Sequence, residues 1–151
     1  MKRLHKALMM PWAGRDPSFD YTNLVIAMAP IAYWPMAEAS GVTMIDASGN
    51  GRNGVYLGAV TLGNAGIGDG RTSAGFGVAG AVGNVYSASL ASAFNGQTLC
   101  FGEWCQVANV GVWSDGVTRR AAAFRTAASN WVMPFRDSGA NGRFSFGYNA
   151  G

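Results

Sequence analysis

Short apolar runs separated by glycine-containing turns make up most of the chain after residue 20. Apolar and polar residues alternate over residues 74–78 and 84–87, which is the period of half-buried strands. Residues 98–107 form the longest alternating run and predict a long strand, whereas segments with a helical period are almost absent. The pattern predicts an all-β fold, an antiparallel β-sandwich of the jelly-roll type.

The segments before residue 98 complete the predicted order of elements. Residues 21–28 predict a helix or a strand, and residues 31–34 predict a short aromatic strand. Residues 54–62 predict a strand pair or one bent strand, and a turn-rich loop follows over residues 64–73. A single helical turn is expected over residues 89–94, with Ser89 as its cap.

The C-terminal third predicts paired strands. Residues 118–125 form one expected strand. Residues 130–135 and 143–148 form an expected hairpin around residues 137–142. Asn141-Gly142 is a strong hairpin signal, because both residues tolerate the positive φ of tight turns.

The segment Pro30-Ile-Ala-Tyr-Trp-Pro-Met-Ala-Glu-Ala-Ser-Gly41 runs from an aromatic strand into a turn, and Asp46-Ala-Ser-Gly-Asn-Gly51 forms a second turn. This order resembles the opening of laminin G-like jelly-roll domains, the concanavalin A-like sandwiches of lectins, adhesins and phage virion proteins. Val55-Tyr56 and the strand around Trp104 stand in the places of later family strands. The resemblance covers residues 21–151 and implies a concanavalin A-like sandwich.

Family domains usually continue through further strands, which the resemblance would place after Gly151. We therefore expect residues 21–151 to be the N-terminal part of the full fold, with a sandwich that is incomplete at its C-terminus. Open strand edges are normally covered. A longer chain or a neighbouring subunit is expected to cover them.

Residues 1–20 are expected to form an N-terminal arm, because Pro11 and Pro17 discourage a long helix. The segment is too short to bury its large apolar groups, so we expect it to dock on the following domain or on another chain, as an assembly anchor. A basic arm can also contact nucleic acid, but nothing else in the chain supports that partner. The basic and aromatic residues of the expected anchor are Lys2, Arg3, Lys6, Trp12 and Phe19.

The chain contains few charged residues. Hydrophobic residues make up 49% of it and charged residues 13%, with 22 glycines that follow no three-residue period. Two explanations remain open: other subunits cover much of the surface, or a glycine-rich β protein presents Ser, Thr, Asn and Gly to solvent.

The two cysteines, Cys100 and Cys105, lie five residues apart in the predicted long strand. An odd separation places them on opposite faces, too far apart for a disulfide while the strand is regular. We expect two free thiols, at least one of them buried, and no metal site. No apolar run is long enough to span a membrane, and Pro11 interrupts the faint likeness of the N-terminus to a signal peptide.

The sequence contains few of the residue combinations that enzymes use for catalysis. Glycoside hydrolysis needs two carboxyl groups beside one bond, and the only glutamates are Glu38 and Glu103. The sole histidine, His5, lies in the arm, which leaves no serine or cysteine triad. We expect no enzymatic activity.

Two kinds of ligand site remain as candidates. Asp46, Asn50 and Asp69 could supply oxygen ligands to Ca²⁺, although fixing their own turns is the favoured role, and no cofactor is expected. An aromatic platform for sugars is predicted at two places, each of which could instead belong to the core. The better platform is Trp113 with Asp115, Arg119 and Arg120, and the second is Trp131.

These observations and the resemblance predict a non-catalytic structural or adhesion protein of a virus particle, such as a phage tail, fibre or surface component. Its expected partners are other virion subunits, copies of itself and a cell-surface glycan. The alternative is a carbohydrate-binding lectin module of a bacterial surface protein, and a glucanase-like hydrolase is a distant third.

Overall fold

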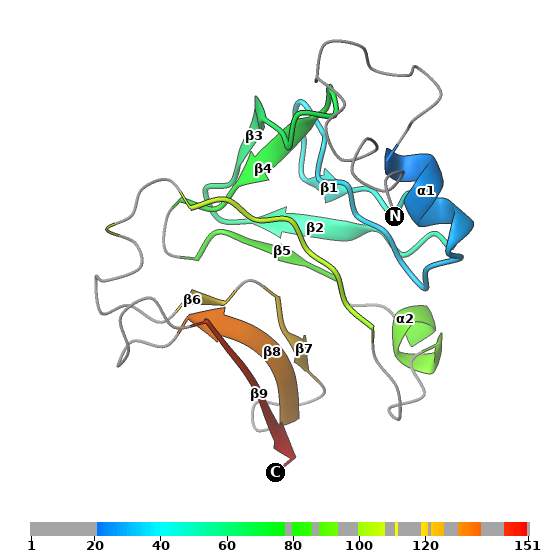
Figure 1. The fold of residues 1–151 in the computed structure, drawn as a ribbon, viewed down its shortest axis with the longest axis vertical. Coiled ribbons are helices and arrows are strands. Elements are labelled where there is room, and N and C mark those ends of the chain that lie inside the picture. The colour runs from blue at the N-terminus through cyan, green and yellow to red at the C-terminus, as the bar shows by residue number, and fades with distance from the viewer. Residues whose placement is uncertain are drawn as a thin grey trace, which may run out of the picture. The chain divides into compact units, whose positions relative to one another are not determined.

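The structure, a computed structural model, describes residues 21–77, 80–85, 88–93, 100–107, 111, 119–120, 122–125, 130–136 and 144–150. The chain divides into two units, Met1–Leu99 and Cys100–Gly151, and each is described by itself below. Antiparallel strands dominate the described residues, which also contain two short helices (Figure 1). The expectation of a β-rich fold is thus confirmed at this level.

The main sheet of the first unit has three antiparallel strands in the order β1-β2-β5. They are β1 (Thr43–Met44), β2 (Gly54–Leu57) and β5 (Val82–Asn84). Met44 and Tyr56 on the inner face are 2% and 5% exposed, and the Tyr56 ring lies 6.4 Å from that of Phe76. The inner face therefore carries a small core.

Two glycines make room for Met44 in this core. A Cβ atom built on Gly54 would lie 2.5 Å from Met44 Cε and 2.8 Å from the carbonyl oxygen of Asn84. A Cβ atom on Gly83 would lie 2.9 Å from Met44 Sδ. The thioether occupies the space that side chains at these two positions would fill, so the core depends on close backbone approach.

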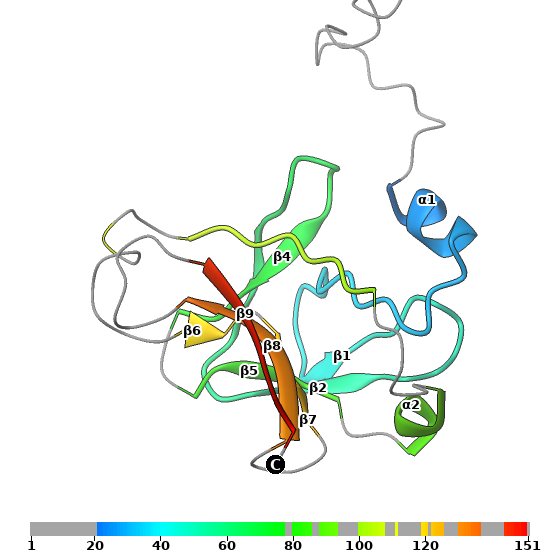
Figure 2. The ribbon, with the colours of Figure 1, turned by 60° about the horizontal axis from the view of Figure 1, so that its bottom comes forward.

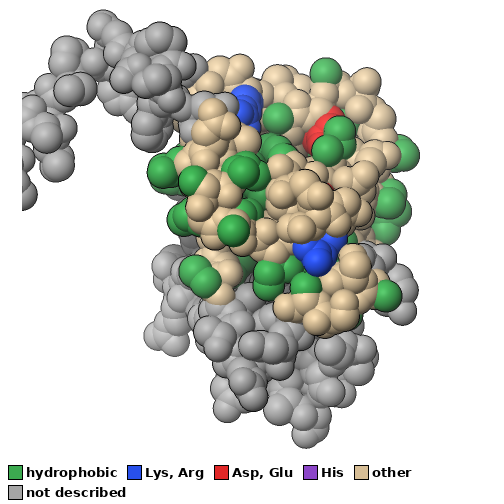
Figure 3. Space-filling view, turned by 90° about the vertical axis from the view of Figure 1, so that its right-hand side faces the viewer, with side chains coloured by type: hydrophobic (Ala, Val, Ile, Leu, Met, Phe, Trp, Pro, Cys, Tyr) green, Lys and Arg blue, Asp and Glu red, His purple; other side chains and the backbone are tan. Residues whose placement is uncertain are grey.

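The outer face of the same sheet carries three exposed apolar residues beside the polar Thr43 and Asn84. Val55, Leu57 and Val82 are 45–46% exposed, and Leu57 lies directly opposite Val82 in the ladder. An antiparallel sheet with one solvated face normally carries polar residues there. Figure 3 shows one side of the molecule, on which hydrophobic side chains of the described residues are spread among polar ones and charged groups are few.

A separate two-stranded sheet pairs β3 (Thr61–Ala65) with β4 (Thr72–Gly75). The residues predicted as a strand pair or one bent strand are thus two strands in different sheets, separated by a turn in which Gly58 has φ +72°. The predicted loop over residues 64–73 is shorter, because both of its ends continue these strands. The Thr72 hydroxyl donates to the carbonyl oxygen of Ala37 at 2.7 Å and ties the hairpin to the segment before β1.

The two helices are α1 (Tyr21–Ala27) and α2 (Ala88–Ala93). The first settles the helix-or-strand alternative. The second confirms a helical turn in the region predicted, but it begins at Ala88, so Ser89 lies within the helix and is not its N-cap. The strands predicted at residues 74–78 and 84–87 both begin and end earlier, so they overlap β4 only at residues 74 and 75 and β5 only at Asn84. The apolar alternation located these strands, but their bounds depend on the pairing partners.

The strand predicted over residues 31–34 is absent from the structure. The Tyr33 carbonyl accepts a backbone hydrogen bond from Ala47 N at 2.7 Å, but Tyr33 N donates to the Asp46 carboxylate instead of to a strand. Pro30 and Pro35 have no N–H to offer. The segment is therefore attached to its neighbour by a side chain, without a ladder.

The second unit contains a four-stranded antiparallel sheet around β8 (Asn130–Arg136). β9 (Phe144–Ala150) pairs with β8 along its whole length, from Arg136↔Phe144 to Asn130↔Ala150 (Figure 2). β6 (Arg119–Arg120) and β7 (Phe124–Arg125) pair with the two ends of β8 on its other edge. The predicted hairpin is confirmed, and its connecting residues 137–143 lie outside the described residues.

Pro134 lies in the middle of the central strand, where a proline is usually excluded. β6 pairs with residues 135 and 136 of β8, and β7 pairs with residues 131 and 132. Pro134 falls between these two short partners, where the missing N–H interrupts no pairing with β6 or β7. Because this edge of β8 is paired by two short strands instead of one long strand, it can accommodate Pro134.

The long strand predicted over residues 98–107 is wrong for residues 100–107, which adopt no regular element. Alternation of apolar and polar residues produces a strand only where a neighbouring strand can form hydrogen bonds with it. No described strand pairs with residues 100–107. Cys100 and Cys105 are both free, as expected, but both are exposed, which corrects the expectation that one is buried. Trp104 is 70% exposed.

Among the described residues, neither helix has the length and apolar character needed to cross a membrane. The arm residues Lys2, Arg3, Lys6, Trp12 and Phe19 lie outside the described residues, so the assembly anchor stays a prediction.

Candidate functional site

The Asp46 carboxylate organises the turn between β1 and β2. Its Oδ1 atom accepts hydrogen bonds from Tyr33 N and Ser48 N, both at 2.9 Å, and its Oδ2 atom accepts one from Arg52 N at 2.9 Å. The residue is 7% exposed, the one buried polar residue among those described. Asp46 thus joins the turn to the segment before β1.

The environment of Asp46 favours its ionised form. Burial alone would raise the pKa of this carboxyl, but the hydrogen bonds from Tyr33, Ser48 and Arg52 outweigh burial and hold the pKa below its ordinary value. A carboxylate in this state accepts backbone N–H groups on both oxygens. It acts as a fixed structural anion.

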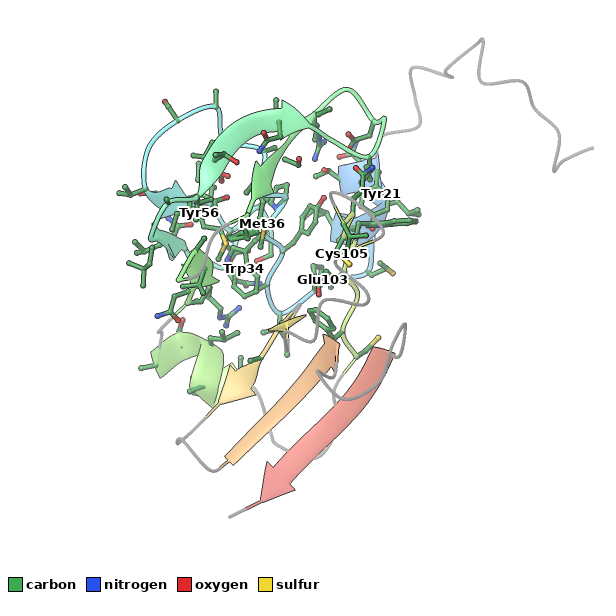
Figure 4. The ribbon with its side chains drawn as sticks, turned by 90° about the vertical axis from the view of Figure 1, so that its left-hand side faces the viewer. Tyr21, Trp34, Met36, Tyr56, Glu103 and Cys105 are labelled. Atoms are coloured by element: carbon green, nitrogen blue, oxygen red, sulfur yellow. The ribbon has the colours of Figure 1, made fainter. Side chains whose placement is uncertain are left out.

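Asn50 and Arg52 extend the same hydrogen-bond network. The Asn50 amide nitrogen donates to the carbonyl oxygens of Pro30 and Ile31, at 3.2 and 3.0 Å. Arg52 Nη1 also donates to Ile31 O, and the Arg52 carbonyl accepts from Trp34 Nε1 at 2.8 Å. Figure 4 labels Trp34 in this segment. The polar residues of the turn therefore hold the Pro30–Trp34 stretch in place.

Glu38 makes a second connection of the same kind. Its Oε1 atom accepts from Ile45 N at 2.8 Å, and its Oε2 atom accepts from the Tyr56 hydroxyl at 2.6 Å. Burial, and then the hydrogen bond and negative charge of Glu38, raise the pKa of Tyr56 far above its ordinary value. Tyr56 is labelled on β2 in Figure 4. Both carboxylate oxygens of Glu38 are thus engaged in fixing the first unit.

The three calcium candidates lie on two different turns. Asp46 and Asn50 belong to one turn, where their hydrogen bonds confirm the turn-fixing role. Asp69 lies between β3 and β4, accepts from Arg71 N at 3.0 Å and lies 3.9 Å from Arg71 Nε. Among the described residues, no group of three or more His, Cys, Asp or Glu side chains could hold a metal ion.

The other glutamate, Glu103, belongs to the second unit and is exposed. Glu38, in the first unit, is occupied by Ile45 and Tyr56. The expectation that the chain is not an enzyme stays a prediction.

The predicted sugar platforms fall on the second unit. Trp113 and Asp115 lie outside the described residues, whereas Arg119 belongs to β6 and Trp131 to β8. Arg119 is directly opposite Arg136, and Trp131 precedes Arg136 by five positions along β8. Because successive residues of a strand alternate between faces, Arg119 and Trp131 lie on opposite faces of this sheet.

Register instead places other polar residues beside Trp131. Arg125 of β7 and Asn149 of β9 are its direct partners on either side, which makes a row across three strands. Arg120 lies opposite Phe135, four positions from Trp131 and so on the same face. Arginine and asparagine next to an aromatic residue are residue types suited to binding a sugar.

Sequence reasoning missed Arg125 and Asn149. Their relation to Trp131 is non-local and depends on the register of two strand pairs, which no short motif specifies. The alternation within residues 130–136 and 144–150 was the available signal, and it shows only that the segments are strands.

In comparisons with known proteins, no family model, no curated protein and no solved structure matches the chain.

Proposed function

We propose that the chain is a non-catalytic structural or adhesion subunit of a virus particle, a tail, fibre or surface component of a bacteriophage. The proposed domain is a concanavalin A-like jelly-roll sandwich that serves assembly or attachment to a host-surface glycan. The virion assignment is based on the resemblance of residues 30–51 to laminin G-like domains.

The observation that carries an assembly role is the outer face of the β1-β2-β5 sheet. Val55, Leu57 and Val82 leave nearly half of their surface exposed on a face that a free antiparallel sheet would make polar. Contiguous exposed apolar groups are typical of protein–protein contact surfaces. The low share of charged residues, 13%, supports the same interpretation.

The carboxylates of the first unit support a structural role as well. Asp46, Glu38 and Asp69 each accept a backbone N–H that fixes a turn or joins two segments. Their hydrogen bonds account for their presence without a substrate.

The test is self-association of the full chain, measured by sedimentation velocity over a wide range of protein concentration. We expect concentration-dependent assembly that Leu57→Ser weakens. The matched control is Ile67→Ser, which makes the same change at a residue of similar exposure in the loop between β3 and β4. A chain that stays monomeric at every concentration, or equal effects of the two substitutions, would contradict the assembly role.

The row Arg125–Trp131–Asn149 favours a second candidate function, a carbohydrate-binding lectin module of a bacterial surface protein. A glycan array with the full chain tests it. Trp131→Ala should abolish sugar binding, whereas Trp104→Ala, which removes a 70% exposed tryptophan, should leave it unchanged. Trp113→Ala tests the other predicted platform. Binding that survives both Trp113→Ala and Trp131→Ala would refute these platforms, and cleavage of a β-glucan would overturn the non-catalytic proposal.

A further inference from the structure

Among the described strands, β9 is a seven-residue edge strand that carries neither a charge nor a proline. β8 pairs with it at every position from Phe144 to Ala150, and no second strand pairs with β9 among the described residues. Its sequence, Phe-Ser-Phe-Gly-Tyr-Asn-Ala, contains no charged residue and no proline. Proteins usually place charges, prolines or bulges on an exposed edge to prevent pairing with another chain. β9 thus offers an open template for one more strand.

The sequence of β9 is complementary to itself. Antiparallel pairing of two copies about Gly147 would place Phe146 opposite Tyr148 and Ser145 opposite Asn149, with Gly147 opposite its own counterpart. On one face Phe146 would then meet Tyr148, and Phe144 would meet Ala150 at the ends. Small or polar residues would meet on the other face. Cross-strand pairs of these kinds stabilise antiparallel sheets.

We propose that β9 of one copy pairs antiparallel with β9 of a second copy about a two-fold axis at Gly147, so that the two four-stranded sheets continue into one. This inference rests on the proposed assembly role and adds a second contact to the one proposed at the outer face of the β1-β2-β5 sheet. An isologous contact requires a segment that matches itself, and β9 does so in this register. An unrelated strand could use the same backbone groups, but it would not match both faces.

Charge substitution tests this register in the full chain. Ser145→Lys combined with Asn149→Lys places like charges directly opposite each other twice, and we expect the dimer dissociation constant to rise by at least about tenfold. Ser145→Lys combined with Asn149→Glu changes the same two positions but places opposite charges together, so the dimer should persist. Circular dichroism of both variants checks that the sheet remains folded.

Cysteine cross-linking gives a second test that does not depend on affinity. The native thiols are first removed by Cys100→Ser and Cys105→Ser. Gly147→Cys then places two thiols across the axis, and oxidation should join the two copies. Ser145→Cys is the matched control, because its two copies would lie four residues out of register, about 13 Å apart along the strands and beyond disulfide reach.

Each outcome is decisive for the proposal. Cross-linking by Gly147→Cys but not by Ser145→Cys, with a dimer that only the double-lysine variant weakens, supports it. Equal cross-linking by the two cysteine variants, or equal dimerisation of the two charge variants, overturns the β9 contact but leaves the assembly role standing. A wild-type chain that is monomeric at all concentrations overturns both.

Discussion

The described residues of the two units show two kinds of hydrogen bond to the backbone. In the first unit, carboxylates and amides bind backbone groups: Asp46 holds Tyr33, Ser48 and Arg52, and Glu38 holds Ile45. In the second unit, β8 and β9 pair along seven-residue strands. The first kind of contact depends on a few side chains. The second depends on backbone N–H groups, as do the strand pairs of the first unit. Substitutions should separate the two.

The largest expected effect is that of Asp46→Ala. The substitution leaves the part-buried backbone donors of Tyr33, Ser48 and Arg52 without their acceptor and should lower the free energy of unfolding by about 4 kcal/mol. Urea unfolding followed by near-ultraviolet circular dichroism measures it. Asp69→Ala is the matched control, because Asp69 is more exposed and fixes a single turn, and it should cost less than about 1 kcal/mol. Equal losses would contradict the anchoring role of Asp46.

A backbone substitution should be most damaging in the second unit. Val132 has a partner on each side, Phe124 and Tyr148, so Val132→Pro removes a ladder hydrogen bond and should cost about 3 kcal/mol. Pro134 lies between β6 and β7, and Pro134→Ala should change the free energy of unfolding by less than about 1 kcal/mol. Hydrogen exchange of the β8 and β9 amides measures both. A large loss from Pro134→Ala would show that the proline itself holds the edge.

Substitution of the glycines that pack against Met44 in the core of the first unit should have an intermediate effect on the free energy of unfolding. Gly54→Ala brings a methyl group against Met44 Cε and the Asn84 carbonyl and should cost about 2–3 kcal/mol, with Gly83→Ala costing about 1–2 kcal/mol. In a Met44→Ala background the penalty of Gly83→Ala should vanish, whereas that of Gly54→Ala should persist because Asn84 O remains. A double-mutant cycle by urea unfolding measures the coupling. Additive effects of Gly83→Ala and Met44→Ala would contradict the packing.

Tyr56→Phe should have a smaller effect with a distinct pH dependence. It removes the hydrogen bond to Glu38 and should cost about 1–2 kcal/mol at neutral pH. Because the folded-state pKa of Tyr56 is raised, its contribution is present below the ordinary tyrosine pKa of about 10 and is lost as the pH rises above that value. The wild-type and Tyr56→Phe stabilities should therefore converge in alkaline solution. A constant difference would indicate that the hydroxyl does not titrate with unfolding.

The smallest effect is expected in acid. The pKa of Asp46 is lowered in the folded chain, so its contribution is present above the ordinary aspartate pKa of about 4 and is lost as the pH falls through the lower folded value. Asp46→Asn should be less stable at neutral pH and should lose less stability between pH 5 and pH 2. Urea unfolding at several pH values measures this slope. Parallel curves would show that Asp46 contributes no acid dependence.

Sequence reasoning succeeded where the cause of an element is local. Glycine, asparagine and aspartate marked the turns around Gly41 and Gly49, both of which have positive φ in the structure. The helical turn of α2 and the β8–β9 hairpin also followed from local composition and alternation. It failed at residues 31–34, because the backbone donor of Tyr33 is taken by an aspartate 13 positions away.

Register limited what could be predicted of the candidate site. A two-residue turn at Asn141-Gly142 would place Ala140 opposite Arg143, whereas the strands pair Arg136 with Phe144. The difference of three positions reverses which residues share a face. Trp131 could be proposed from its residue type alone, but its neighbours Arg125 and Asn149 could not.

The hydrogen bonds of Asn50 also bear on the chemical stability of the protein during storage. Asn50 is followed by Gly51, an arrangement that leaves the side-chain amide open to attack by the next backbone nitrogen, and asparagine is among the thermolabile residues. Hydrolysis would replace an N–H donor by a carboxylate that faces the carbonyl oxygens of Pro30 and Ile31. Stored protein should then lose the attachment of this segment as its intact mass shifts, and the unfolding midpoint would fall in step. The amide that attaches this segment to the turn is thus also the place where chemical damage would first release the segment.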